Sequence, residues 1–296
     1  MSHAANRNIL VTGVNGQVGF ELARSMQGLG RVVALDRQQF DLTNFDQIRG
    51  VIRELKPALI VNPAAYTAVD QAEKDADTAM RINGEAPGVI AEEAKRLGAA
   101  LFHFSTDYVF DGTKSVPYVE TDETNPQNVY GASKLAGEQA IEVVGASSLV
   151  FRTSWVYGRR GKNFLLTMLR LAAEKPALRI VGDQIGAPTW SKTIATLAAH
   201  IAAQGLPAGD DWWAEKSGVY HLSAGGSTSW AGFAEAIFNL AALEKKPTVE
   251  AIPATEYPVP AKRPANSRMS CAKLAEAFGL QVPDWDQALR LCIGEA

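Results

Sequence analysis

The sequence predicts an α/β protein, built on a doubly wound parallel sheet with a smaller second α/β domain. In the first half of the chain, short apolar segments alternate with amphipathic helical segments in units of about thirty residues, which is typical of βαβ crossovers. The short segments are rich in Val, Ile and Leu on both faces, as a sheet covered by helices on both sides requires. A glycine-rich turn follows the first of them, where doubly wound sheets bind ligands.

The first half contains the strands of this sheet and the helices that connect them. Apolar runs predict strands at 8–12, 31–35, 59–62, 100–104 and 149–152. Apolar residues at helical spacing predict helices at 17–29, 45–55, 76–82, 84–97 and 129–144. The carboxyl ends of parallel strands meet at one edge, so the residues that follow each strand are candidates for a ligand site.

The second half is less regular and predicts the smaller domain. Helices are expected at 162–175, 192–204, 230–243, 270–278 and 284–293, and strands at 178–181 and 218–222. Prolines between 247 and 268 exclude long helices there. The run 218–222 resembles a strand that returns to the first sheet. We therefore expect a dinucleotide-binding domain at 1–155 with a returning segment near 186–225, and a substrate domain at 156–185 and 226–296.

The composition excludes several classes of function. The 296 residues are 47% hydrophobic with a net charge of −3 and no basic stripe, so we expect a sizeable core and no nucleic-acid partner. No apolar run is long enough to span a membrane, and no signal-peptide pattern follows MSHAANRN, so we expect a cytoplasmic protein. The histidines lack metal-ligand spacing, and Cys271 and Cys292 are expected to stay reduced.

The stretch ILVTGVNGQVG predicts a dinucleotide site, because its glycines lie between a strand and a helix. Gly13 allows the tight turn, Gly16 lets the backbone approach a pyrophosphate at the helix N-terminus, and Gly19 lets helix and strand pack closely. This arrangement is the mark of a Rossmann domain. The candidate cofactor ligands in this loop are Gly13, Asn15, Gly16, Gln17, Val18 and Gly19.

The end of the second expected strand bears on the choice of cofactor. Asp36 lies close to the ~20-residue spacing at which an acid binds the adenosine ribose hydroxyls and favours NADH, unless it is only a turn residue. Arg37 follows it and would accommodate a 2′-phosphate, so the sequence predicts NADPH or NADH. Weaker candidates for cofactor contact are Asp41, Leu42, Ala64, Ala65 and Tyr66.

The segment VYGASKLAG places Tyr130 one helical turn before Lys134, a spacing that most exposed helices also show. The strand 100–104 runs into Ser105 and Thr106, so both hydroxyls are expected at the same crevice as the glycine loop, with Ser105 near the cofactor. A dinucleotide site, a hydroxyl at a strand end and the tyrosine–lysine pair together predict hydride transfer coupled to proton transfer at a carbonyl or alcohol.

The predicted chemistry gives each of three residues a role. A Lys134 ammonium would lower the pKa of the Tyr130 phenol from its usual value of about 10, and would also bind the nicotinamide ribose. Tyr130 would act as the general acid, and Thr106 would hydrogen-bond the substrate oxygen unless it is only a cap at the strand end. The small residues at 131–133 would leave clearance for the cofactor.

The motifs of the chain, taken together, resemble those of a known family. The segments GVNGQVG, NPAAYTAVDQAE, FSTDYVFDG, VYGASKLAGE, RTSWVYG, DQIGAPT and RPANSR, in this order, are similar to those of the dTDP-4-dehydrorhamnose reductases, which are extended short-chain dehydrogenases/reductases. The resemblance covers roughly residues 8 to 293. It implies reduction of dTDP-6-deoxy-L-lyxo-4-hexulose at C4 to dTDP-L-rhamnose by NADPH or NADH, the last step of dTDP-L-rhamnose synthesis.

The resemblance assigns Tyr130, Lys134 and Thr106 to catalysis, as above, and adds substrate residues. Asp107 is implied near the site without a chemical role. Trp155 would pack beside the sugar or nicotinamide, although it could be plain core. Asn163 would bind the substrate's phosphate or sugar, and Gln184 would lie along the nucleotide-sugar. Arg268 would lie there too, where its planar fork suits phosphate oxygens, although a surface ion pair is the alternative.

One departure from the family concerns a metal ion. Some members form dimers through a metal ion bound by clustered glutamates. The matching positions here would be Glu21, Lys192 and, loosely, Glu295. Because an ammonium in place of a carboxylate opposes cation binding, we expect no such metal site. The chain is then expected to be a monomer, or a homodimer that needs no metal.

Two other functions stay open on the sequence. One is a related nucleotide-sugar ketoreductase, epimerase or dehydratase. Dehydratases usually carry a carboxylate pair beside the threonine, whereas Thr106 is followed by Asp107 and Tyr108. The other is a non-catalytic regulatory subunit on the same scaffold, against which an intact Tyr130, Lys134 and Thr106 argue.

Overall fold

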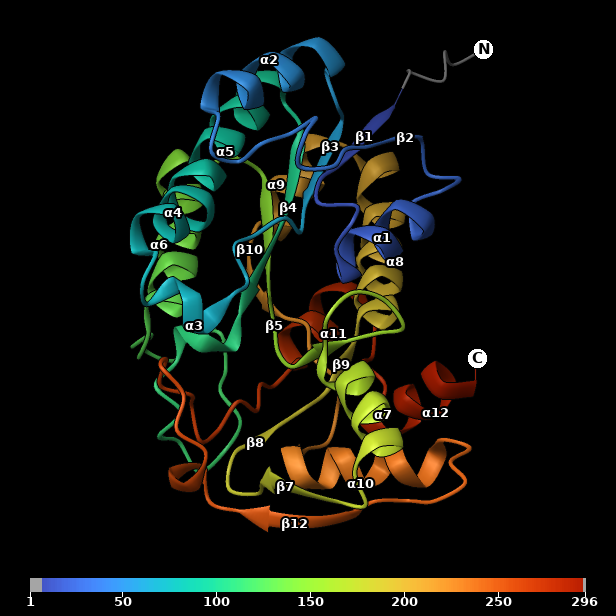
Figure 1. Ribbon diagram of the computed structural model, residues 1–296. Helices are drawn as coiled ribbons and strands as arrows, with labels where there is room; N and C mark the ends of the chain where they lie inside the picture. Colours follow the sequence, from blue (N-terminus) through green and yellow to red (C-terminus); the bar gives the residue numbers. More distant parts are fainter. Residues whose placement is uncertain (1–6, 295–296) are drawn as a thin grey trace.

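The computed structural model describes residues 7–294, which contain a central six-stranded parallel sheet (Figure 1). The strand order is β10-β5-β4-β3-β1-β2, and all neighbouring pairs are parallel. The chain leaves β1 toward β2 on one side and then continues through β3 on the other, which places a topological switch point between β1 and β3. The predicted doubly wound sheet is confirmed. The strands are β1 (Asn8–Val11), β2 (Arg31–Ala34), β3 (Leu59–Asn62), β4 (Ala100–Thr106), β5 (Ser148–Thr153) and β10 (Gly218–His221).

Helices cover both faces of this sheet (Figure 1). Successive strand residues point to opposite faces, so Ile9 and Val11 enter one core and Leu10 enters the other. The first core is closed by α1 (Gln17–Ser25), α8 (Ser191–Ala208), α9 (Asp210–Lys216) and α11 (Ala272–Phe278). The second is closed by α2 (Phe45–Leu55), α5 (Ala86–Leu97) and α6 (Val129–Val144).

Helix α6 carries the tyrosine–lysine pair and is fixed at both ends. The Asn128 side chain accepts a hydrogen bond of 2.8 Å from the Gly131 N–H and so caps the first turn. Asn128 Nδ2 also donates to the Lys262 carbonyl at 2.8 Å, which ties the start of α6 to the C-terminal part of the chain. Gly145 ends the helix in the left-handed conformation, with φ of 65°. The helix spans the residues that the sequence predicts.

The helical region between β3 and β4 differs from the prediction. It begins with α3 (Val69–Ala72) and α4 (Ala76–Met80), and then a π-helical turn, η1 (Arg81–Glu85), leads directly into α5. A π turn adds one residue to the helical repeat and is frequent at functional sites. Here it buries the Asn83 amide, whose Oδ1 accepts from the Tyr66 N–H at 2.8 Å. Asn83 Nδ2 donates to the Tyr66 carbonyl and to Ser133 Oγ, both at 3.0 Å. The loop after β3 is thereby tied to α6.

The remaining elements form a smaller layer at the bottom of Figure 1, with its own core around Tyr157, Phe233, Ile237 and Leu289. Strand β10 returns to the main sheet beside β5, as predicted. Strand β12 lies in the proline-rich region and is missed by the sequence analysis, because those prolines flank the strand instead of interrupting it. The helices of this layer are α7 (Phe164–Glu174), α10 (Trp230–Leu240) and α12 (Trp285–Gly294).

Short strand pairs complete the structure between 156 and 252. Strand β7 (Ala177–Val181) pairs with β12 (Thr248–Ile252), β6 (Val156–Tyr157) with β9 (Thr189–Trp190), and β8 (Ile185–Gly186) with β11 (Thr228–Ser229). Two 3₁₀ turns, η2 (Asp107–Val109) and η3 (Ala254–Glu256), follow β4 and β12. Within residues 7–294, no helix is long and apolar enough to cross a membrane. Cys271 and Cys292 form no disulfide.

Candidate active site

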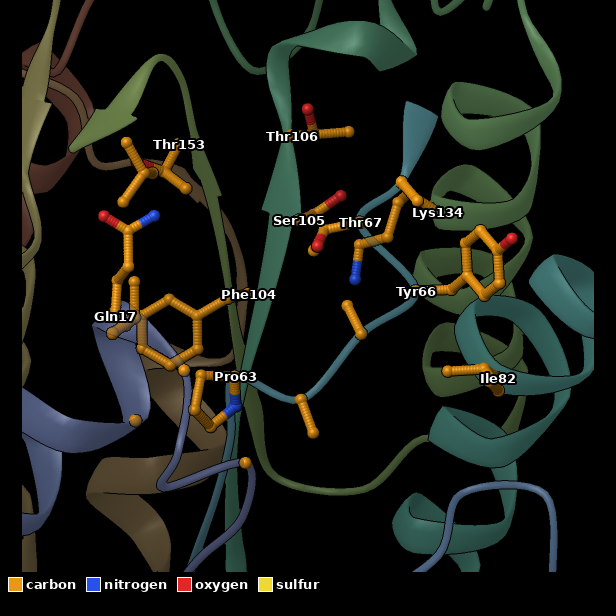
Figure 2. A pocket seen from close by; sticks show the side chains of 18 of the residues that line it. Gln17, Pro63, Tyr66, Thr67, Ile82, Phe104, Ser105, Thr106, Lys134 and Thr153 are labelled. Atoms are coloured by element: carbon orange, nitrogen blue, oxygen red, sulfur yellow. The ribbon is translucent and has the colours of Figure 1, made fainter. Parts of the chain in front are cut away.

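A cavity of about 870 Å³ opens at the carboxyl ends of β1, β3, β4 and β5, beside the switch point (Figure 2). A second cavity of about 490 Å³ shares Asn15, Arg37 and Asp41 with it. Most of the predicted site residues therefore lie together. Those that line the large cavity are Gly13, Asn15, Gly16, Gln17, Val18, Gly19, Arg37, Asp41, Leu42, Ala64, Ala65, Tyr66, Ser105, Thr106, Asp107, Tyr130, Lys134 and Trp155.

The glycine loop brings the N-terminus of α1 to the cavity wall. Gly13 has a φ of 58°, and a Cβ placed there would lie 2.9 Å from the Ala64 Cβ. A Cβ on Gly19 would lie 2.3 Å from the Gly13 carbonyl oxygen, so helix and strand approach as closely as the sequence predicts. No side chain caps α1 at Gly16, which leaves the N–H groups of its first turn for an anion. This cradle fits a pyrophosphate.

Asp36 and Arg37, which follow β2, both line the smaller cavity. Asp36 Oδ1 accepts hydrogen bonds from the backbone N–H of Gln38 at 2.9 Å and of Gln39 at 3.2 Å, so the carboxylate shapes the turn as well. Arg37 is exposed and lines both cavities. Asp41 binds the Thr43 backbone N–H, and this bond lowers the pKa of the Asp41 carboxyl.

Thr106 and Tyr130 meet at the cavity from two different elements. Thr106 ends β4 and Tyr130 lies in the first turn of α6, and both side chains line the cavity. Burial raises the pKa of Tyr130 to about 12, although the neighbouring Thr106 hydroxyl acts in the opposite direction. The phenol therefore keeps its proton at neutral pH, as a general acid for carbonyl reduction must.

Lys134 reaches from α6 into the cavity near Ser105 (Figure 2). Only 1% of the lysine is exposed, and its Nζ lies 3.1 Å from Nε2 of His103 on β4. Burial lowers the pKa of Lys134 to about 8, while the charge of Glu138 one turn further along α6 acts to raise it. The pKa of Tyr130 is set mainly by burial of the phenol. The pKa of Tyr130 is thus raised where the sequence predicts a lowered value, because desolvation of the phenol prevails.

The small residues between Tyr130 and Lys134 make room for protein instead of cofactor. A Cβ on Gly131 would lie 2.2 Å from the Tyr108 carbonyl oxygen. Ser133 Oγ donates to the Tyr130 carbonyl at 2.8 Å and accepts from Asn83. None of the residues at 131–133 lines the cavity. Their size lets α6 pack closely against the turn after β4 and against the π turn.

Asp107 is a buried carboxyl group on the cavity wall, with 3% of the residue exposed. Burial raises its pKa to about 6, and the nearby Ser267 hydroxyl and a hydrogen bond from Thr106 act in the opposite direction. Thr106 Oγ1 also accepts from the Tyr108 backbone N–H at 3.2 Å, so the threonine caps the 3₁₀ turn η2 while it faces the cavity. Thr106 is thus a cap at the strand end, as one interpretation of the sequence has it, and it also lines the cavity.

Trp155 lines the cavity but has neighbours on its ring. It stacks on Trp230 of α10 with the ring centroids 3.5 Å apart. A Cβ on Gly186 would lie 2.5 Å from Trp155 Cε2, so backbone packs tightly against the indole too. Its φ of 47° is unusual for a residue with a side chain, and such strain persists where the surrounding structure enforces it.

The other three predicted substrate residues line neither cavity. Asn163 caps α7 through the Leu166 N–H and donates to Gln17 Oε1 at 2.9 Å, so it contacts the glycine loop instead of the cavity. Arg268 donates to the Ser115 carbonyl at 2.6 Å. Gln184 is half-buried in the turn before β8.

Several residues at the cavity are missed by the sequence analysis. Thr153 ends β5 and Ser154 follows it, and the rule that selects Ser105 and Thr106 would have selected them too. His103, which contacts Lys134 but does not line the cavity, gives no motif signal, because a single histidine in an apolar strand is usually core. The further lining residues are Phe40, Pro63, Thr67, Ala68, Val69, Ile82, Phe104, Tyr108, Val156, Gly161 and Lys162.

Two of the positions that match the family's metal site, Glu21 and Lys192, lie within the described residues. Lys192 lies over the Trp190 ring, with Nζ 5.3 Å from the ring centroid. Glu295 falls outside the described residues. Among residues 7–294, no group of three His, Cys, Asp or Glu side chains could hold a metal ion.

Known proteins resemble this chain along nearly its whole length. Residues 7–296 match the family model described as the RmlD substrate binding domain. The chain is 52% identical to a dTDP-4-dehydrorhamnose reductase of Burkholderia thailandensis, over 96% of this chain and 97% of that protein. It is 42% identical to a dTDP-4-dehydrorhamnose reductase of Escherichia coli K12, over 97% of each.

Solved structures agree with this match. The dTDP-4-dehydrorhamnose reductase of Bacillus anthracis in complex with NADP aligns with a TM-score of 0.91 and 35% identity, over 98% of this chain and 100% of that one. A Thermus thermophilus UDP-glucose 4-epimerase, at 19% identity over 97% and 98% of the chains, shares the fold with a TM-score of 0.79. The full-length family match, the identities and the residues gathered at the switch point lead to one conclusion: the chain belongs to the dTDP-4-dehydrorhamnose reductase family, which carries the RmlD substrate binding domain.

Proposed function

We propose that this protein reduces the C4 keto group of dTDP-6-deoxy-L-lyxo-4-hexulose to dTDP-L-rhamnose with NADPH or NADH. The observation that carries the proposal is the meeting of Thr106, Tyr130 and Lys134 on one wall of the cavity whose other wall is the glycine loop. The names of the relatives at 42% and 52% identity support the reaction. The NADP complex of the similar Bacillus anthracis enzyme supports the cofactor.

The glycine loop is the part of the chain that would hold the cofactor. Gly13 and Gly19 leave no room for side chains between β1 and α1, and the uncapped N-terminus of α1 offers N–H groups to a pyrophosphate. Arg37 would face a 2′-phosphate and Asp36 a ribose hydroxyl, which suits either NADPH or NADH. When bound, the reduced nicotinamide supplies the hydride that reaches C4 of the sugar.

Tyr130 and Thr106 would act on the oxygen of the C4 keto group. Both hydroxyl groups line the cavity, where they would donate hydrogen bonds to one carbonyl oxygen. Negative charge develops on this oxygen during reduction, and Tyr130 donates its proton there, so the ketone becomes an alcohol. Lys134 then stabilises the phenolate that remains, because its ammonium comes from the same face of α6.

The substrate side of the cavity would be built by the second part of the chain. We assign cofactor binding to 1–155 with 186–225, and the nucleotide-sugar to 156–185 and 226–296. Asp107 and Trp155 would contact the sugar directly, since both line the cavity. Gln184 would lie along the nucleotide-sugar. Asn163 and Arg268 would act by shaping the surrounding loops, for which their bonds to Gln17 and Ser115 are the basis. The assembly would be a monomer or a metal-independent homodimer.

A coupled assay tests the reaction. The purified protein is mixed with NADPH and the 4-keto-hexulose made in situ, and the absorbance of the reduced cofactor is followed while the product is identified by chromatography. The proposal predicts one dTDP-L-rhamnose for each NADPH consumed. An epimerase would convert the sugar without net loss of NADPH. Absence of turnover with every dTDP-4-keto sugar would contradict the proposal.

A further inference from the structure

Behind the cavity, four buried side chains form a continuous hydrogen-bonded chain. Thr12 follows β1, Asn62 ends β3, His103 lies on β4 and Lys134 on α6, so the chain crosses adjacent strands of the sheet. Thr12 Oγ1 lies 2.6 Å from Asn62 Oδ1, Asn62 Nδ2 lies 3.2 Å from His103 Nδ1, and His103 Nε2 lies 3.1 Å from Lys134 Nζ. Each residue is at most 1% exposed, which leaves no bulk water to replace these partners.

The hydrogen atoms of this chain depend on the charge of Lys134. A charged ammonium has only donors, so His103 Nε2 must accept and Nδ1 must carry the ring proton. Nδ1 then donates to the Asn62 oxygen, and the Asn62 NH₂ turns toward Thr12. A neutral Lys134 amine can accept from Nε2–H, and the ring then accepts at Nδ1 from the Asn62 NH₂ while Thr12 donates to the Asn62 oxygen. The two patterns use the same heavy-atom positions, because a half-turn of the amide exchanges its oxygen and nitrogen.

Neither hydrogen-bond pattern contains a doubly protonated His103 imidazole. Burial and the charge of Lys134 hold the pKa of His103 well below its usual range, so the ring stays neutral. Two other titratable groups lie near Lys134 on α6: Tyr130, which lines the same cavity, and Glu138, whose charge acts on the lysine. Glu138 is itself paired with Arg152 of β5. The hydrogen bond that the structure gives to Lys134 Nζ is therefore the one with His103.

We propose that His103 is a positioning residue for Lys134, and that the protonation of Lys134, the tautomer of His103 and the orientation of the Asn62 amide change together. His103 occupies one of the three donors of the ammonium and leaves two for the cavity. The role rests on the proposed function only in that Lys134 serves the reaction. The coupling of tautomer and charge is a property of the folded protein alone.

The coupling is tested on the wild-type protein by NMR. Long-range ¹H–¹⁵N spectra of protein with ¹⁵N-labelled histidine distinguish the two neutral tautomers, and the His103 signals are those lost in His103→Asn. The proposal predicts the Nδ1–H tautomer below the Lys134 pKa of about 8 and the Nε2–H tautomer above it. The same tautomer on both sides of that pH, or an imidazolium on either side, overturns the coupling. This readout does not depend on turnover, so it stands even if the proposed reaction fails.

The positioning role is tested with two amides. A glutamine amide at 103 reaches the place of Nε2 and can accept from Lys134, whereas an asparagine amide reaches only the place of Nδ1. We expect His103→Gln to keep kcat within about threefold and His103→Asn to lower it about 100-fold, the size of effect expected from a misplaced group. In His103→Asn the ammonium loses an acceptor, so the alkaline limb of the kcat profile moves to lower pH.

A second buried histidine gives the matched control. His221 is 0% exposed and bonds the Ser270 carbonyl, away from the cavity. His221→Gln should lower the thermal stability and leave the alkaline limb in place. Equal losses in the two His103 variants with an unmoved limb, or an unchanged kcat in His103→Asn, would overturn the positioning role.

Discussion

Arg152 on β5 and Glu138 on α6 form a doubly hydrogen-bonded ion pair inside the protein. Arg152 Nη2 lies 2.6 Å from Glu138 Oε2 and Nε lies 3.0 Å from Oε1, and both side chains are 5% exposed. The Ser105 hydroxyl donates to the same carboxylate. Glu138 also lies one turn from Lys134, and its charge opposes the lowering of the Lys134 pKa by burial. The pair thus joins the central sheet to the helix of the proposed general acid.

Loss of the carboxylate charge should be costly for folding. Glu138→Gln leaves the Arg152 guanidinium buried without a countercharge, and we expect the free energy of unfolding to fall by about 3–5 kcal/mol. The exposed pair of Arg170 and Glu174 serves as the control, and Glu174→Gln should change it by less than about 0.5 kcal/mol. Urea denaturation followed by circular dichroism measures both. Similar losses in the two variants would mean that burial adds nothing to the pair.

Removal of the Tyr130 hydroxyl should stop the reaction and spare the cofactor site. In Tyr130→Phe the developing alkoxide has no proton donor at that position, so kcat should fall by about 10²–10⁴-fold. NADPH affinity, measured by fluorescence titration, should remain within about twofold. Tyr257→Phe removes a phenol that is 60% exposed and should behave as wild type. A Tyr130→Phe variant with near-normal kcat would disprove the assignment of the acid.

Substitution of Gly13 should lower the NADPH affinity more than substitution of Gly28 does. Gly13→Ala forces a Cβ to 2.9 Å from the Ala64 Cβ and strains the left-handed backbone, so we expect NADPH affinity to fall at least about tenfold. Gly28 has a similar positive φ of 88° but open space around it. Gly28→Ala should therefore cost about 1–2 kcal/mol of stability and leave NADPH affinity unchanged. NADPH titrations and thermal melts of both variants measure this difference. Equal losses of NADPH affinity in the two variants would mean that backbone strain alone, and not the contact with Ala64, is responsible.

Asp107 should make stability depend on pH in an unusual direction. Its pKa is raised to about 6 in the folded protein, so its contribution is present below the unfolded pKa of 3.8 and is lost as the pH rises through about 6. Asp107→Asn cannot ionise. Its unfolding free energy, relative to wild type, should therefore rise by roughly 2 kcal/mol between about pH 4 and about pH 7.

Asp122 provides the opposite case for the same measurement. A hydrogen bond from Lys114 lowers the pKa of the Asp122 carboxyl, so its contribution is present at neutral pH and lost in acid. Asp122→Asn should thus be less stable than wild type near pH 7 and closer to it near pH 4. Denaturant titrations at both pH values give the two signs. Slopes of the same sign in both variants would refute the assignment for Asp107.

Removal of divalent cations should not change the assembly. Lys192 stands where the family's metal site would need a carboxylate, so sedimentation velocity should give the same species in Mg²⁺ and in EDTA. Lys192→Glu restores a carboxylate at this position and tests whether the lysine charge is what opposes metal-dependent assembly. A wild-type dimer that dissociates in chelator would contradict the prediction.

The sequence predicts those parts of the molecule that depend on local patterns. The switch point follows from apolar runs and glycines, and the conformations of Gly13 and Gly19 agree with their predicted purposes. The pKa of Tyr130 could not be predicted in this way, because it depends on burial and on where the Lys134 amine points. Both depend on the tertiary structure, about which a Y-x-x-x-K pattern contains no information.

The substrate side was harder to predict for a related reason. The sequence identifies Asn163 and Arg268 as polar residues in shared motifs, but it does not distinguish a ligand contact from a hydrogen bond within the protein. The structure gives Asn163 to the glycine loop and Arg268 to a neighbouring carbonyl group. In both cases the polar group has a partner already, which only the spatial arrangement reveals.

The π turn at Arg81–Glu85 makes the length of this region matter. Deletion of a single residue there would restore an uninterrupted α-helix and rotate Asn83 by about 100° relative to α5. The Asn83 amide would then lose Tyr66 and Ser133 together, and the loop after β3 would be released from α6. A homologue one residue shorter in this region therefore needs other contacts to hold the loop after β3 against α6. A one-residue gap here in an alignment would indicate a change in how that loop is held.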